Sequence, residues 1–248
     1  MRYENTITGE FIKRPNRFIA YCLINGKEEK VHVPNTGRCK ELLVPGAKVI
    51  LNRCSEEKLK TRKTEYDLVS VYKGNRLVNL DSQSPNLLAV EGLKNGKIMG
   101  ERKISFIQRE KTFGNSRFDI YYEREEKGNR IKGFIEVKGV TLEEGNEAFF
   151  PDAPTERGLK HLKELVEAKE AGYETSVLFV VQMENIKMFY PNLKTQREFG
   201  KQLLDCENNG VDILCYGCNV QPSEVKINES IDVCNLREYL EINKGEKQ

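Results

Sequence analysis

Two stretches of alternating apolar and polar residues, 116–122 and 131–137, constrain the fold of this chain more than any other feature. Alternation at this period predicts two half-buried strands, and the turn-rich segment 125–129 between them predicts a hairpin. A tight turn between Lys127 and Gly128 gives each residue of the first strand one defined partner on the second. The local pattern alone therefore predicts which side chains face each other.

This register places three charged side chains together. Asp119 falls directly opposite Glu136, and Lys138 lies on the same face because residues two apart in a strand share a face. Facing carboxylates repel each other, and a divalent cation would remove the repulsion. Two oxygen ligands suit Mg²⁺, and a neighbouring ammonium offsets charge on a phosphate in its transition state. The pattern predicts metal-assisted phosphodiester hydrolysis; the alternative is an exposed strand face that simply carries charges.

The 248 residues of the chain suffice for two modest domains. We expect them at 1–80 and 81–240, followed by a flexible tail at 241–248. The first residues lack the apolar core of a signal peptide, and the purest apolar run, 177–181, is too short to span a bilayer. These features predict a cytoplasmic protein without a membrane partner, and nothing in the sequence supports a homo-oligomer.

Cysteine and histidine usage narrows the chemistry. Seven cysteines, an odd number in a chain without export features, favour reduced thiols over a disulfide framework. His32 and His161 are too few for a multi-histidine zinc site. Cys215 and Cys218 form a CxxC motif inside a strand-like run, which favours buried structural thiols; a redox or zinc site is the alternative.

The amino-terminal part is basic and rich in short strands. Residues 1–80 contain 16 Lys and Arg against 9 Asp and Glu, whereas the rest of the chain contains 24 against 29. A positive surface attracts phosphate backbones, although a merely solvated surface has the same composition. The alternation predicts a small closed barrel, for which an oligonucleotide/oligosaccharide-binding (OB) barrel is the candidate. Its predicted strands are 18–24, 29–33, 47–51, 67–72 and 76–78.

The loop at 34–46, between two of these strands, carries Arg38 and Lys40. Main-chain amides together with two cations suit a phosphate group. The alternative is a loop that only closes the barrel and leaves its cations solvated.

Residues 81–240 mix helices with strands. The apolar periodicity predicts helices over 85–93, 155–171 and 194–206, and strands over 174–181 and 211–220, the last strand of the chain. On the second helix, Arg157, His161 and Glu164 form a face separate from the apolar stripe. With the hairpin, these elements predict a mixed sheet flanked by helices, so the chain is of the α+β or α/β class in two domains.

Four motifs in order resemble the sugar fermentation stimulation protein A family. They are Pro34-Asn-Thr-Gly through Pro45-Gly46, Asn115-Ser-Arg-Phe-Asp119, Glu136-Val-Lys-Gly-Val-Thr141 and the segment from Phe150 to His161. The resemblance extends over residues 1–222. It implies an OB-type nucleic-acid-binding barrel joined to a nuclease-like domain of the PD-(D/E)xK class. Members of the family are described as DNA-binding proteins with a proposed regulatory role in sugar use.

The resemblance also implies roles for individual residues. Asp119 and Glu136 match the metal-binding carboxylates of this nuclease class, Lys138 matches its catalytic lysine, and Glu91 matches an additional acidic residue. The expected cofactor is Mg²⁺ or Mn²⁺, and the expected partner is DNA. The residues expected to contact nucleic acid are Asn35, Arg38, Lys40, Arg117, Arg157, Lys160 and His161.

Two functions fit these features. The first is a Mg²⁺-dependent nuclease, and the second is a DNA-binding regulatory protein that keeps the nuclease fold without turnover. Asp119, Glu136 and Lys138 are all intact, which favours the first. A thiol or zinc protein is a distant third.

Overall fold

The computed structural model describes residues 1–35, 37–100 and 102–245. The chain forms two compact units. The first comprises residues 1–84, 182–184 and 218–226, and the second comprises 85–181, 185–217 and the residues from 227 onwards.

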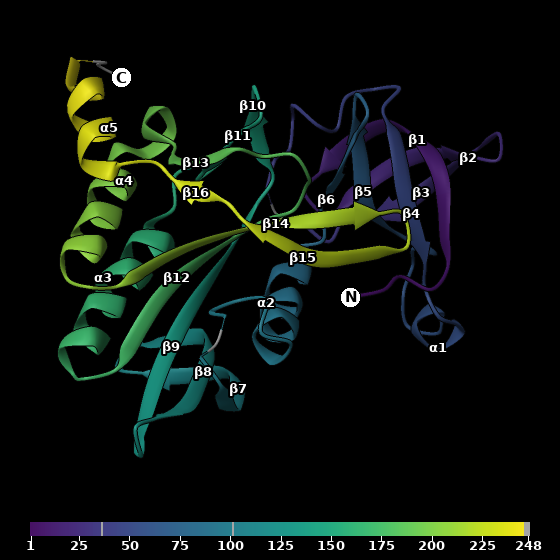
Figure 1. The fold of residues 1–248 in the computed structure, drawn as a ribbon. Coiled ribbons are helices and arrows are strands. Elements are labelled where there is room, and N and C mark those ends of the chain that lie inside the picture. The colour runs from purple at the N-terminus through teal and green to yellow at the C-terminus, as the bar shows by residue number, and fades with distance from the viewer. Residues whose placement is uncertain (36, 101, 246–248) are drawn as a thin grey trace. The chain divides into compact units, whose positions relative to one another are not determined.

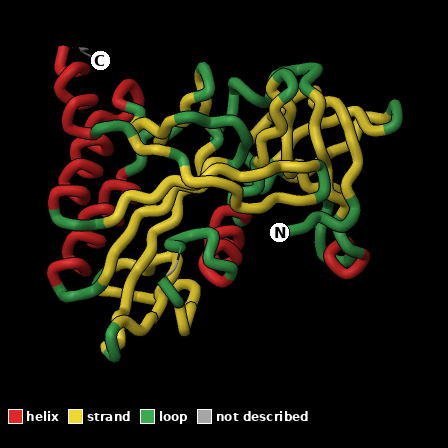
Figure 2. The backbone as a smooth tube through the Cα atoms, in the orientation of Figure 1, coloured by secondary structure: helices red, strands yellow, loops and turns green. Residues whose placement is uncertain are grey.

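The first unit is a closed five-stranded barrel, as predicted. Strand predominates in this part of the chain (Figure 2). Neighbouring strands follow the order β3-β2-β1-β4-β5, β3 pairs with β5 to close the barrel, and β6 extends the sheet beyond β5. The strands are β1 (Thr6–Asn16), β2 (Ile19–Ile24), β3 (Lys27–His32), β4 (Lys48–Arg53), β5 (Tyr66–Lys73) and β6 (Arg76–Asn79), with the short helix α1 (Glu56–Leu59) before β5.

The longest barrel strand, β1, is absent from the sequence prediction. Its register against β2 shifts on both sides of Lys13. Such a shift moves the following side chains to the other face, so the period of two is lost. A tight hairpin joins β2 and β3, because Asn25 and Gly26 both adopt the positive φ that a two-residue turn requires, 51° and 81°.

Two segments that we expected in the second domain belong to the first unit, namely 182–184 and 218–226. Main-chain hydrogen bonds explain the second of them. The amide of Tyr3 donates to the carbonyl of Ser223 at 2.8 Å, and the amide of Val225 donates to the carbonyl of Met1 at 3.0 Å. Pairing between residues so distant in sequence leaves no local signal.

The second unit is built on a mixed sheet flanked by helices, as predicted. The strand order is β15-β14-β12-β9-β8-β7, with β12 parallel to both β9 and β14. Helices α3 and α4 lie along one side of the sheet and α2 along the other (Figure 1). The elements are α2 (Ser84–Lys94), β7 (Ile104–Phe113), β8 (Ser116–Glu126), β9 (Asn129–Val140), α3 (Glu156–Glu170), β12 (Glu174–Val181), α4 (Leu193–Asn208), β14 (Asp212–Gln221) and β15 (Glu224–Ser230).

A smaller sheet accompanies it, with the order β10-β11-β13-β16. Its strands hold two to four residues each, which is too short for a periodic pattern to be recognised. The prediction that 211–220 is the last strand is wrong, because β15 and β16 follow it. The strands of this sheet are β10 (Leu142–Glu144), β11 (Glu147–Phe150), β13 (Met188–Pro191) and β16 (Asp232–Val233).

Helix α5 (Leu236–Ile242) and a 3₁₀ turn (Asn243–Gly245) include residues that we expected in a flexible tail. Arg197 holds the end of α5, since its guanidinium donates to the carbonyls of Leu240 at 3.2 Å and Asn243 at 2.7 Å. Residues 246–248 of the expected tail lie outside the described residues. No helix in the described ranges is long and apolar enough to cross a membrane.

A glycine in the central hairpin supports a testable prediction about stability. Gly133 lies opposite Tyr122, whose ring is fully buried and whose hydroxyl donates to Glu174 at 2.8 Å. A methyl group at Gly133 would overlap that ring. We expect Gly133→Ala to lower the free energy of unfolding by about 1–3 kcal/mol. Urea denaturation measures this, with Lys132→Ala on the exposed face as control; equal midpoints for both variants would contradict the prediction.

Candidate active site

The β8–β9 hairpin has the register that its turn predicts. Residues 127 and 128 form the turn with φ of 50° and 79°, and pairing continues without a shift to Ile120 opposite Ile135. The predicted register is confirmed as far as this pair. Asp119 and Glu136 are the next residues on their strands, and their direct pairing stays a prediction.

Glu136 is almost completely buried, with 2% of its surface exposed. Its Oε1 accepts a hydrogen bond of 2.5 Å from Lys138 Nζ and another from His161 Nδ1. Its Oε2 is buried and has no hydrogen-bond partner among the described residues. A buried carboxylate oxygen without a partner is costly. A positively charged ligand would be stabilised at this atom.

Asp119 is held by two hydrogen bonds. The amide of Val137 donates to Oδ2 at 2.8 Å, and Asn86 Nδ2 donates to Oδ1 at 2.9 Å. Val137 stands between Glu136 and Lys138 on β9, so the strand that carries two site residues also orients the third. Asn86 lies in the first turn of α2. The sequence did not indicate this contact, because the sequence of a helix does not show which strand the helix packs against.

The two carboxylates have opposite pKa shifts. Burial raises the pKa of Asp119, and the nearby charge of Glu136 raises it further. Burial also acts to raise the pKa of Glu136, but Lys138 and His161 outweigh it, so this pKa is lowered overall. Glu136 is thus held in its charged form while its neighbour resists ionisation. A divalent cation would favour the charged form of both groups.

The donor set suits a hard divalent cation with an open coordination shell. Mg²⁺ commonly binds one or two carboxylates and keeps several waters. Across the described part of the chain, no three or more His, Cys, Asp and Glu side chains gather into a metal cluster. A cation on Asp119 and Glu136 would therefore leave most coordination positions to water and substrate oxygens. Such a site would differ from a closed structural site, in which protein ligands fill every position.

Helix α3 supports Glu136 through His161. Thr155 caps the start of this helix, since its side chain accepts a hydrogen bond of 2.9 Å from the Gly158 amide. His161 is 5% exposed, and Arg157 Nε donates to its Nε2 at 3.4 Å, which leaves Nδ1–H to face Glu136. We expected His161 to contact nucleic acid, and that contact stays a prediction. In the structure its ring is buried and bonded to the carboxylate of Glu136.

The other expected contacts of this unit lie on its surface. Arg157 and Lys160 on α3 are exposed, and so is Arg117, whose guanidinium lies 3.5 Å from Glu110. Their contact with nucleic acid remains a prediction. Glu91 is exposed on α2, and the contact from that helix to Asp119 comes from Asn86.

The three residues of the barrel loop that we expected to contact nucleic acid differ in their exposure and bonding. Asn35 Nδ2 donates to the carbonyl of Leu80 at 2.8 Å, and its Oδ1 accepts from the amide of Gly37 at 2.7 Å. We expected Asn35 to bind nucleic acid, and that contact stays a prediction; in the structure both ends of its amide have partners within the first unit. Arg38 and Lys40 are exposed and remain predicted phosphate contacts.

The cysteines show no reactive or metal-binding arrangement. All seven are buried and none forms a disulfide within the described residues. Burial raises the pKa of Cys206 and of Cys218 to about 12, so both thiols stay protonated at neutral pH. The thiol alternative gains no support.

Two family models match the chain. The SfsA N-terminal OB domain matches residues 12–80, and the Sugar fermentation stimulation protein RE domain matches residues 83–224. The chain belongs to the sugar fermentation stimulation protein family. This confirms the resemblance carried by the four sequence motifs.

Members of the family match this chain over both units. Sugar fermentation stimulation protein homologs from Desulfitobacterium hafniense (strain DSM 10664 / DCB-2) and Alkaliphilus oremlandii are 51% and 46% identical, each over 233 residues. These matches cover 94% of this chain and 98% of each relative. The structure of Pyrococcus furiosus SfsA in complex with Ca²⁺ has a TM-score of 0.82 at 25% identity, covering 94% of this chain and 97% of that one.

Proposed function

We propose that this protein is a nuclease that uses Mg²⁺ or Mn²⁺ to hydrolyse phosphodiester bonds in DNA. The arrangement around Glu136 carries the proposal. One oxygen of its carboxylate is held by Lys138 and His161, and the other is buried without a partner among the described residues. Asp119 stands at the adjacent position of the hairpin, and both carboxylates suit the same cation.

Each residue has a separate task in this proposal. The bound cation would polarise the phosphodiester and lower the pKa of an attacking water. Asp119 and Glu136 would hold the cation. Lys138, whose side chain is 14% exposed, would offset negative charge that develops on the phosphate. His161 fixes the orientation of Glu136, and Asn86 fixes that of Asp119.

A relative supports the choice of a divalent cation. SfsA of Pyrococcus furiosus was solved in complex with Ca²⁺. Ca²⁺ and Mg²⁺ both take oxygen ligands, although Mg²⁺ requires shorter bonds and stricter octahedral geometry. We propose Asp119 and Glu136 as the ligands in this chain.

The test is a cleavage assay with the purified protein on single-stranded and duplex DNA, with Mg²⁺, Mn²⁺ or a chelator. Shortened products with either metal, and none with the chelator, would support the nuclease. Binding without cleavage on any substrate would contradict it and favour the non-catalytic regulatory protein. RNA of the same sequence in parallel would show whether the activity is confined to DNA.

The barrel loop supports a prediction about salt dependence. Arg38 and Lys40 are exposed cations on one loop. If both contact phosphates, replacing both by alanine weakens DNA binding and reduces the slope of log affinity against log salt by about 2. A salt series followed by fluorescence anisotropy, with chelator present, measures this. Lys27→Ala at the exposed β2–β3 hairpin is the matched control, and an unchanged slope in the double variant would remove the loop from the binding surface.

A further inference from the structure

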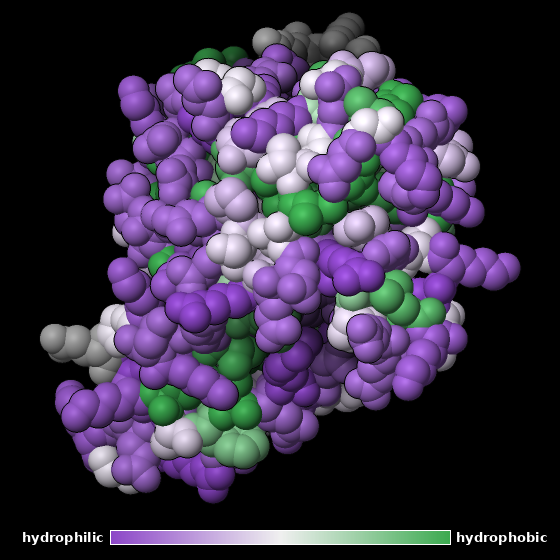
Figure 3. All heavy atoms as spheres, turned by 90° about the vertical axis from the view of Figure 1, so that its right-hand side faces the viewer, coloured by the Kyte–Doolittle hydropathy of each residue, from purple (hydrophilic) through white to green (hydrophobic). Residues whose placement is uncertain are grey.

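An aromatic side chain is held in solvent at the turn between β1 and β2. Phe18 is 52% exposed. The face drawn in Figure 3 is largely hydrophilic and carries separate hydrophobic patches. The main chain of Phe18 is nevertheless fixed, since its amide donates to Asn16 Oδ1 at 2.9 Å and its carbonyl accepts from the amide of Val33 at 2.8 Å. A rigid turn that presents a large apolar ring to water suits a ligand with an apolar face.

Arg14 ties this turn to the basic loop of the barrel. Its guanidinium donates to the carbonyl of Arg17 in the turn at 2.6 Å. It also donates to the carbonyls of Asn35 at 2.7 Å and of Gly37 and Arg38 at 2.8 Å each. One half-buried cation thus holds two loops together, and the side chains of Arg17 and Arg38 remain exposed. Phe18 is thereby placed beside positive charge.

The outer face of the neighbouring strands also combines an aromatic residue with cations. Tyr21 on β2 pairs with Lys13 on β1 and with Lys30 on β3. It faces outwards, because Ala20 and Cys22 on either side of it are completely buried. Lys13 Nζ lies 4.9 Å from the centre of the Tyr21 ring. An aromatic residue paired with a lysine on each neighbouring strand suits a base with its flanking phosphates.

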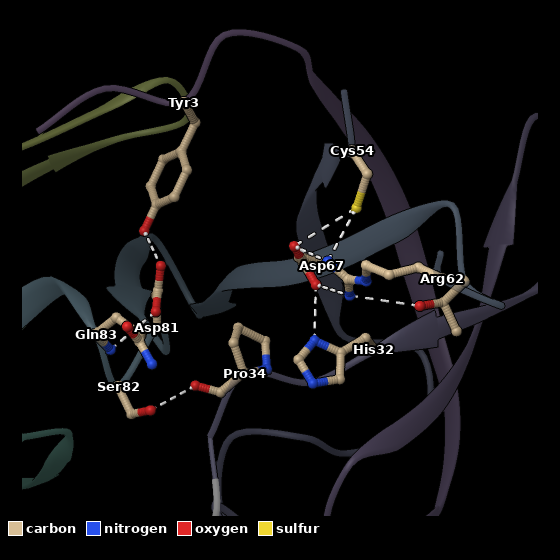
Figure 4. A network of polar contacts seen from close by, with 10 residues as sticks. Tyr3, His32, Pro34, Cys54, Arg62, Asp67, Asp81, Ser82 and Gln83 are labelled. Carbon is tan, nitrogen blue, oxygen red and sulfur yellow. Dashed lines mark hydrogen bonds and ion pairs between the residues drawn. The ribbon is translucent and has the colours of Figure 1, made fainter. Parts of the chain in front are cut away.

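His32 pairs with Ile19 on β2, which shares a face of the strand with Tyr21. Its Nδ1 donates to Asp67 at 2.7 Å, and Arg62 donates to the same carboxylate at 2.6 Å (Figure 4). The second nitrogen of the ring, Nε2, points away from Asp67 (Figure 4). A fixed polar group therefore lies on the same face as the Tyr21 ring.

The charge on this face changes along β2, from positive near Phe18 to negative near Leu23. At its far end, Leu23 pairs with Glu10 on one side and Glu28 on the other. Glu28 also lies 3.6 Å from Lys13. Phosphates are repelled by the acidic end and attracted to the end that carries Phe18. The part of the surface that suits a phosphate-bearing ligand is therefore the half that carries Phe18 and Tyr21.

We propose that this half of the barrel face binds single-stranded nucleic acid, with Phe18 and Tyr21 stacking on unpaired bases and Lys13 and Lys30 contacting phosphates. The inference rests on the proposed nuclease function and deepens it. Bases in a duplex keep their faces stacked on one another, so only an unpaired strand can use these rings. Arg14 is a positioning residue, since it touches main-chain carbonyls beneath the surface.

The test compares the affinities of variants for a fluorescent oligothymidine and for a duplex of equal length, with chelator present to prevent cleavage. Phe18→Ala is expected to lower single-strand affinity about 5- to 100-fold, the range for loss of one stacked base, and to change duplex affinity little. Phe18→Trp is expected to retain affinity. Leu23→Ala, which changes an exposed apolar residue on β2, is the matched control and should equal wild type.

Two outcomes overturn the inference. One is unchanged single-strand affinity in Phe18→Ala, and the other is an equal loss for single strand and duplex. A Mg²⁺ cleavage assay on the same proteins separates this result from the proposed function. Cleavage by wild type together with unchanged binding by Phe18→Ala defeats the inference alone, whereas the predicted binding pattern without any cleavage defeats the nuclease and leaves the inference standing.

Discussion

Replacement of Glu136 by glutamine is expected to lower Mg²⁺-dependent cleavage at least about 100-fold, the usual cost of one lost electrostatic contact in a transition state. The amide has nearly the same shape as the carboxylate but lacks its charge. Oε2 is the buried atom without a partner among the described residues, and Oε1 binds Lys138 and His161. The substitution therefore weakens the cation site and leaves two donors facing a neutral group.

Two measurements distinguish this effect from misfolding. DNA affinity in the presence of chelator should equal that of wild type, because the change is confined to the cation site. Glu126→Gln makes the same chemical change on β8, at an exposed position beside the hairpin turn, and should leave cleavage unaffected. Equal cleavage by Glu136→Gln and Glu126→Gln would remove Glu136 from the mechanism.

Replacement of Lys138 by alanine is expected to lower kcat by about 100- to 1,000-fold. Its ammonium lies 2.5 Å from Glu136 Oε1 and is positioned to offset charge on the phosphate. Because Lys138 is proposed to act in the transition state, kcat should fall and KM should change little. Steady-state kinetics on a labelled oligonucleotide measures both constants.

Lys132→Ala is the matched control for this change. Lys132 lies on the same strand, is exposed, and pairs with Glu123 at a position away from the carboxylates. A rise in KM with kcat unchanged would assign Lys138 to substrate binding. Full activity in the Lys138 variant would contradict its proposed role.

The hairpin site is predictable from sequence because its geometry is local. A turn at residues 127 and 128 determines the partner of every residue up to Ile120, and the register follows without knowledge of the remaining chain. The identity of the barrel is likewise accessible from short alternating segments. Strand β1 is the exception, since its register shifts beside Lys13 remove the alternation.

The contacts that hold the site residues in place could not be predicted from the sequence in this way. His161 stands on a helix face that the pattern describes only as polar, and its burial against Glu136 depends on how α3 packs on the sheet. Asn86 reaches Asp119 from a helix 33 residues earlier in the chain. Asn35 carries a side chain suited to nucleic acid, yet its amide is bonded to Leu80 and Gly37. These contacts depend on tertiary packing, for which one sequence contains no periodic signal.

The most direct measurement of the central claim is the rate of DNA cleavage by the wild-type protein across a Mg²⁺ titration, with Asp119→Asn assayed beside it. Asp119 and Glu136 are proposed to hold one cation together. The account predicts a rate that rises with Mg²⁺ and saturates in the wild type, falls to background with chelator, and stays near background in the variant at every concentration. Cleavage that is independent of Mg²⁺, or equal in both proteins, would contradict it.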